Sequence, residues 1–262
     1  MRFTVAAAAA LTLIAMAATT APAGVVISQD VAVTNQAGER KSQQTVMVQG
    51  NKQKVVTAER VFITDLDAGK LYVLLLAKKT YGQMEIPPKG TVGTVLAADG
   101  LFLQYERGSG TGKEGGYDCQ DYAGAQNVGH LKLEATECVA NAAPGAQEFV
   151  AFRKALAEQL KKSPLASKGE TPDGIPMSST LTTTFVPFRI PGGFSPDMAA
   201  KTKAAEASNK PSIRKTKVTK IEVKDLSAAT FVVPADFSQK GAPPIPKLPA
   251  PSAGASPAAA PH

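Results

Sequence analysis

The residues that could do chemistry in this chain are few and far apart. Residues 110–115, GTGKEG, match the G-x-G-x-x-G pattern of dinucleotide-binding proteins, in which a following helix holds the phosphates at its N-terminus. The next residues, GYDCQDY, are typical of a strand, so we interpret the glycines as a flexible hairpin connection. A P-loop is also excluded, because Arg107 stands where its first glycine would be and Glu114 follows the lysine.

The sequence gives equally little support for a catalytic histidine, a metal site or an activated serine. His130 and His262 are the only histidines, and His130 adjoins Gly129 at the start of a strand, where a lone histidine is usually solvated surface. The sequence contains no H-E-x-x-H and no G-x-S-x-G. Asp65 and Asp67 flank a turn, where aspartate is favoured for local hydrogen bonds. We therefore expect no catalytic residues, no metal ligands and no cofactor, and a hydrolase is the least favoured class.

Cys119 and Cys138 are the only cysteines. They lie on two neighbouring predicted strands, almost equidistant from a turn near residues 127–129, so a cross-strand disulfide is geometrically reasonable. Disulfides persist in oxidising compartments, and without a C-x-x-C motif this one is expected to be structural.

The N-terminus agrees with an oxidising compartment. Arg2 precedes a run of apolar and small residues over 5–18, followed by Ala-Pro-Ala at 21–23. This pattern is typical of a secretory signal peptide (residues 1–23) cleaved after Ala23. The run is too short to span a bilayer, so we expect no transmembrane segment in the mature chain. No cysteine follows it to carry a lipid anchor, and we predict a periplasmic protein, with secretion as the alternative.

The rest of the chain suggests one domain and a tail. Residues 24–240 suit a single β-rich domain, whereas residues 241–262 are rich in Pro and Ala and are expected to be disordered. The formal charge is +7, and removing Arg2 with the leader leaves +7 − 1 = +6. Basic residues are densest over 201–224, where Lys217 to Lys224 mostly alternate with apolar residues as on the solvated face of a strand. An anionic envelope surface is therefore a better partner than nucleic acid.

Turn signals recur about every 8 to 12 residues, which is typical of an antiparallel meander. We predict strands at 25–34, 43–49, 54–64, 70–76, 80–86, 101–106, 117–122, 131–139, 180–186 and 214–223.

Strand 70–76 is unusual because residues 71–76 are all apolar, whereas most of the other strands alternate at least roughly. Both of its faces must therefore be covered. One clear helix, 146–162, could cover one face, because Phe149, Phe152, Leu156 and Leu160 form a single apolar stripe. Shorter helices are possible at 91–98 and 197–207. These elements predict a strongly bent antiparallel sheet with a few helices in or over its concave side.

Several motifs then carry a resemblance to a known family. They are ITDLDAGKLYVLLLAKKTYGQM, GGYDCQDYAG, EATECVANAAPGAQEFVAFRKAL, TPDGIPMSSTLTT and FVVPADF. In this order they resemble a bacterial envelope family of unknown function with a fold similar to the lipoprotein carrier LolA. The resemblance runs from about Gly24 to Phe237. It implies an α+β, mainly β fold: an incomplete, half-open barrel with lid helices around an apolar interior. The carrier's cargo-handling residues find no match here, so lipoprotein transfer is not implied.

Two non-enzymatic functions remain open. The first is binding of a lipid, a lipoprotein acyl chain or another apolar molecule in the concave face of the sheet. The second is a structural or protein-interaction role with a fully packed interior, and a cavity of about 300 Å³ or more under the helices would favour the first. By strand alternation Leu71 and Leu74 point to opposite faces, and the sequence does not decide which face meets the helix. The candidate lining residues are Tyr72, Leu74, Leu76, Phe102, Tyr105, Phe149, Phe152 and Leu156.

Overall fold

The computed structural model describes residues 23–86, 103, 105–128, 131–161, 169–186 and 210–240. The expected leader, the expected helices at 91–98 and 197–207, Phe102, His130 and the expected tail lie outside these residues.

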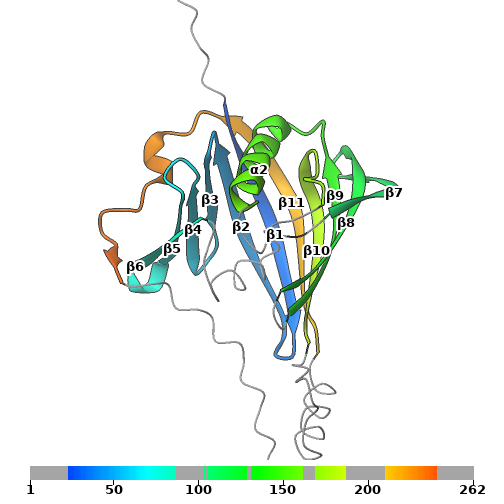
Figure 1. Cartoon of the computed structure of the whole chain (residues 1–262), viewed down its shortest axis with the longest axis horizontal. Helices are drawn as coiled ribbons and strands as arrows, with labels where there is room; N and C mark the ends of the chain where they lie inside the picture. Colours follow the sequence, from blue (N-terminus) through cyan, green and yellow to red (C-terminus); the bar gives the residue numbers. More distant parts are fainter. Residues whose placement is uncertain are drawn as a thin grey trace, which may run out of the picture.

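The described chain folds into a single mainly-β sheet of twelve strands (Figure 1). The order across the sheet is β12-β6-β5-β4-β3-β2-β1-β11-β10-β9-β8-β7. All neighbouring pairs are antiparallel except β12 and β6, which makes the sheet mixed. The strands are β1 (Gly24–Asn35), β2 (Gly38–Gln49), β3 (Lys52–Val56), β4 (Arg60–Asp65), β5 (Lys70–Leu75), β6 (Thr80–Glu85), β7 (Tyr105–Glu114), β8 (Tyr117–Val128), β9 (Leu131–Ala140), β10 (Ile175–Phe185), β11 (Ser212–Lys224) and β12 (Ser238–Gln239).

The centre of the sheet joins the two ends of the domain. Strand β1 pairs with β2 on one side and with β11, almost two hundred residues later, on the other. The turns that follow β2 and β4 use Gly50 (φ 56°) and Gly69 (φ 61°) in the left-handed region, which a glycine adopts at little steric cost.

The predicted strand at 54–64 is in fact two strands. A turn at residues 57–59 separates β3 from β4, which then pair with each other. The Thr57 hydroxyl accepts a hydrogen bond from the Arg60 amide at 3.0 Å and donates one to the Arg60 carbonyl at 3.0 Å. These hydrogen bonds of the Thr57 side chain stabilise a turn in place of an extended strand. The apolar residues on either side of the turn made the sequence look like one continuous strand.

Helix α2 (Ala146–Leu160) confirms the predicted helix. Figure 1 shows it lying across the sheet in front of β1 and β2, with β3–β6 on one side and β7–β10 on the other. Its Phe149 and Phe152 are buried in a core cluster with Val25 and Val48 of the central strands. The helix begins after Gly145, whose φ of 75° suits a residue without a Cβ. Two short 3-10 turns complete the described elements, η1 (Leu76–Lys78) and η2 (Ala228–Phe231).

The predicted half-open barrel needs correction. The described sheet is open, with β12 and β7 at its edges, and it is not strongly curled. It is also mixed rather than wholly antiparallel, and α2 is the one α-helix among the described residues. The alternation of apolar and polar residues indicates which face of a strand is buried. The curvature of the sheet depends instead on bulges and register shifts, such as those at Ser28/Gln29 and Pro176/Ser178, which the alternation does not indicate.

Candidate apolar binding face

Strand β5 is covered on both faces, which explains its unbroken apolar run. Leu71 and Val73 lie on the side of the sheet that carries helix α2, and both are buried there. Leu74 points to the opposite side and is 1% exposed. Two different layers therefore meet on this one strand.

The layer on the helix side, which we call the lateral apolar layer, joins the two halves of the sheet. Six strands (β4, β3, β2, β1, β11 and β10) separate β5 from β9 in the sheet order, yet side chains of both lie in it. Within the described sheet the two halves therefore meet here through side chains and not through strand pairing. Partly buried residues border the layer: Phe62, Met84, Ile86 and Leu156. Its buried members are Leu71, Val73, Leu103, Tyr105, Tyr122, Leu131, Leu133, Ala135, Val139, Leu160 and Leu181.

Tyr105 of this layer contacts two charged side chains, Glu137 and Arg153, where α2 meets β9 and β7. The Tyr105 hydroxyl donates a 2.6 Å hydrogen bond to Oε1 of Glu137. Arg153 of α2 places Nη1 at 3.6 Å from Oε2 of the same carboxylate. Its guanidinium lies over the rings of Tyr105 and Phe149, at 5.6 and 5.9 Å from their centroids. Burial, reinforced by the charge of Glu137, raises the pKa of Tyr105 well above its usual value, so the phenol remains a hydrogen-bond donor.

The opposite side of β5 is covered by the C-terminal segment, residues 225–240. Phe231 of η2 is buried in a cluster with Val61, Ile63 and Leu74, and Phe237 packs against the same cluster. The segment then ends at the edge of the sheet, where β12 pairs with β6. The apolar run of β5 is thus explained on this side by a segment about 150 residues further along the chain.

The structure divides the candidate lining residues between these two sides. The first group, on the helix side, is Tyr105, Phe149, Phe152 and Leu156; the second, facing the C-terminal segment, is Tyr72, Leu74 and Leu76. The two groups are not brought together, and Phe102 lies outside the described residues. Their role in binding a ligand stays a prediction.

Sequence reasoning left open which face of β5 meets the helix, so Leu71 and Val73 could be assigned to the helix side only from the structure. It missed two charged residues on this side. Glu137 and Arg153 carry no sequence signal of this, because a charged residue on a strand or a helix usually faces solvent.

The predicted disulfide between Cys119 and Cys138 is present, with the two Cα atoms 5.3 Å apart. Strand β7 passes beside it, and a Cβ on Gly112 would lie 3.3 Å from Cys138 Sγ. Residues 110–114 of the glycine-rich run are thus part of strand β7, which makes room for the disulfide, and their interpretation as a flexible connection was wrong. Only the last residue of the run, Gly115, lies in the hairpin turn, together with Gly116, and both have positive φ.

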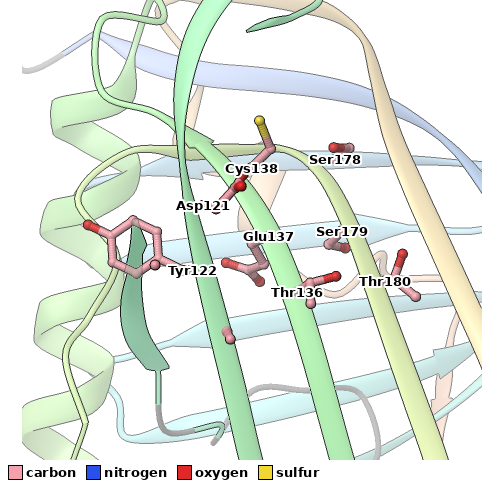
Figure 2. Close-up of a pocket in the computed structure, with 10 residues that line it drawn as sticks. Asp121, Tyr122, Thr136, Glu137, Cys138, Ser178, Ser179 and Thr180 are labelled. Atoms are coloured by element: carbon pink, nitrogen blue, oxygen red, sulfur yellow. The ribbon is translucent and has the colours of Figure 1, made fainter. Parts of the chain in front are cut away.

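A shallow polar hollow of about 320 Å³ lies over β8, β9 and β10. Figure 2 shows its labelled side chains, among them Asp121 of β8, Thr136 of β9 and Thr180 of β10. Its lining is mostly hydroxyl and carboxylate side chains, so it lacks the apolar walls that a lipid chain would need. Glu137 and Tyr122, the latter a member of the lateral apolar layer, also line the hollow, whereas the layer's border residues Phe62 and Met84 do not.

The remaining surface features do not form a chemical centre. Within the described ranges, no three His, Cys, Asp or Glu side chains are grouped so that they could hold a metal ion. The described helix is too short and too polar to cross a membrane. On the basic strand β11, Lys217 pairs with Glu114 at 2.8 Å, and Lys220 and Lys224 both pair with Glu222.

No protein-family model and no curated protein matches the sequence. Among solved structures, PNGF-II is similar at 11% identity and a TM-score of 0.39 over 84% of this chain, which spans about a third (32%) of that protein's length. A DUF1329 family protein from Desulfovibrio piger is similar at 9% identity and a TM-score of 0.34, with 81% of this chain and 91% of that one covered. A LolA superfamily protein from Nitrosomonas europaea is similar at 8% identity and a TM-score of 0.30, again with 81% and 91% covered. The structural neighbours thus include a LolA superfamily protein and a DUF1329 family protein.

Proposed function

We propose that this chain is an exported, non-enzymatic envelope protein that binds a lipid or another apolar molecule on the helix-side face of its sheet. The observation that carries the proposal is the lateral apolar layer. Its two halves are joined only by side chains, so they can separate around an acyl chain without breaking a strand pair of the described sheet.

Replacing side-chain contacts within the layer by contacts with an acyl chain should cost little free energy. Apolar contacts are non-directional, and their strength depends on the area removed from water. The partly buried border of the layer includes Met84, and methionine adapts its shape to irregular apolar partners. Helix α2, which lies over the centre of the sheet, would then act as the movable cover.

The second candidate function, a structural or protein-interaction factor with a packed interior, is favoured by a different observation. Phe152 and Leu74 are each 1% exposed, and Tyr105 and Phe149 are also buried. Side chains packed this closely leave no space for a ligand unless elements move. The two functions therefore differ in whether the helix side opens.

A titration with a fluorescent fatty acid separates the two functions, using one variant on each side of β5. Val73→Ala alters the helix side and Leu74→Ala alters the side under the C-terminal segment. Binding of an apolar molecule predicts saturable probe binding to the parent, a changed affinity for Val73→Ala and an unchanged affinity for Leu74→Ala. Absence of saturable binding in all three folded proteins would support the packed structural role.

The cellular setting is part of the same proposal. We propose cleavage of residues 1–23 after Ala23, a mature domain over residues 24–240 and a disordered extension over 241–262. The disulfide suits an oxidising compartment such as the periplasm. Lys217, Lys220 and Lys224 would face an anionic envelope surface, with part of their charge offset by Glu114 and Glu222.

A further inference from the structure

Helix α2 is tethered differently along its two sides. Toward β2–β5, the Gln159 side chain donates a 2.6 Å hydrogen bond to the Leu66 carbonyl, and the Gly50 amide donates to the Glu148 carboxylate. On the other side, the contacts are the ion pair between Arg153 and Glu137 at 3.6 Å and an exposed pair between Lys154 and Asp173 at 3.5 Å. The first side is therefore held by hydrogen bonds to backbone groups, and the second by longer contacts between charged side chains.

The Glu137 carboxylate is only half satisfied. Its Oε1 accepts the hydrogen bond from Tyr105, whereas its Oε2 is buried without a hydrogen bond from any described residue. The carboxylate side chain is 10% exposed. A buried charge that lacks a hydrogen bond is costly to leave in place, so it depends strongly on its ionic partner.

Arg153 can leave this partner without losing its position. Its side chain is 20% exposed, which allows water to reach it, and the rings of Tyr105 and Phe149 lie beneath the guanidinium. Phe149 lies on the same helix and moves with Arg153, so the guanidinium keeps one aromatic partner when its contacts with Glu137 and Tyr105 open. The ion pair between Arg153 and Glu137 can therefore break and re-form.

We propose that Arg153, Glu137 and Tyr105 form a latch that holds helix α2 against β9 and β7, and that its opening admits an apolar molecule to the lateral apolar layer. The helix then pivots about its contacts with Leu66 and Gly50 at the ends of the β4–β5 and β2–β3 hairpins. The admission of a ligand rests on the proposed function, whereas the latch itself does not.

Hydrogen exchange of the full chain, followed by mass spectrometry of its peptides, tests the latch. The variants are Glu137→Gln and Arg153→Met, which keep size and remove charge, with Tyr105→Phe as a milder change if either fails to fold. The matched control is Lys154→Met, the neighbouring residue, whose ion pair with Asp173 is exposed on both sides. We expect exchange of the α2 amides to rise about tenfold in the first two variants and less in Tyr105→Phe, with β1, β2 and β11 unchanged and the control like the parent.

Two results would overturn the latch. Equal loss of protection in α2 and in the central strands would make the trio a general stabiliser, and unchanged α2 exchange in all folded variants would mean that it holds nothing. The double variant Glu137→Gln/Arg153→Met should exchange no faster than the more severe single variant, because both remove the same contact, and additive effects would contradict this.

A stopped-flow measurement with the fluorescent fatty acid separates this inference from the proposed function. The latch predicts faster probe association in Arg153→Met than in Lys154→Met. Faster α2 exchange with no probe binding in any variant would keep the latch and reject apolar binding. Probe binding at equal rates in all variants, without a change in α2 exchange, would keep the binding function and reject the latch.

Discussion

Lys79 holds Asp236 and the chain that follows it. The Lys79 ammonium lies 2.9 Å from Oδ2 of Asp236, and the Lys79 carbonyl accepts a 3.0 Å hydrogen bond from the Ser238 amide. Lys79 is the one described non-glycine residue with positive φ, at 46°. This backbone conformation ends η1 and directs the carbonyl to the C-terminal segment. The cover over the back of β5 is therefore fixed at the edge of the sheet.

Removing the apolar anchor of this cover should destabilise the domain far more than removing its charge. Phe231→Ala empties a buried site against Ile63 and Leu74, and we expect it to lower the free energy of unfolding by about 3 to 5 kcal/mol. Asp236→Asn should change it by less than about 1 kcal/mol, because exposed ion pairs contribute little. Urea unfolding followed by circular dichroism measures both. The neighbouring Val232→Ala, at a site 59% exposed, is the control for the first change.

The disulfide should be a stabilising link that Gly112 accommodates. Replacing both cysteines by serine should cost about 3 kcal/mol, as the chain-entropy model gives for a closed loop of this size. Gly112→Ala should destabilise the oxidised parent, because the new Cβ would approach Cys138 Sγ. It should destabilise the double-serine protein less, since a serine oxygen is smaller than sulfur. Equal thermal shifts of Gly112→Ala in the two backgrounds would contradict this account.

The Lys52–Asp65 pair should make stability depend on pH at the acid end. Burial raises the pKa of Asp65, but hydrogen bonds from the Lys52 ammonium and the Ala68 amide outweigh it, and the net pKa lies below the usual value. A depressed pKa in the folded state adds stability above the unfolded value of about 3.9, which is lost as pH falls through the folded value. The difference in melting temperature between the parent and Asp65→Asn should thus be largest near pH 6 and shrink below about pH 4. A difference that is constant from pH 6 to the acid limit would count against the pair.

The local pattern was enough for the helix, the disulfide and most strands, because each depends on residues close in sequence. The stripe of Phe149 and Phe152 defined α2, and the uninterrupted run of β5 correctly indicated two covered faces. What covers the second face could not be inferred, because Phe231 reaches Leu74 through tertiary packing. The contact between Arg153 and Glu137 could not be inferred either, because it depends on where the helix crosses the sheet.

The division of β5 between its two sides gives a further stability test. Leu74→Ala should cost about 2 to 5 kcal/mol, because its surroundings are fully packed by the C-terminal segment. Val73→Ala should cost less, both because fewer atoms are removed and because the lateral apolar layer can close around the change. Thermal melts of the two variants measure the difference. A larger loss for Val73→Ala would indicate that the helix side is the more rigid of the two.

Native mass spectrometry of the protein, purified gently from its own envelope, tests the central claim most directly. Binding of an apolar molecule predicts folded protein of two masses, the mature chain from Gly24 and the same chain carrying one lipid. The bound fraction should fall in Val73→Ala and remain in Leu74→Ala, because only Val73 belongs to the lateral apolar layer. A single mass for the bare chain in every sample, together with no uptake of added fatty acid, would contradict the account and leave a structural protein with a packed interior.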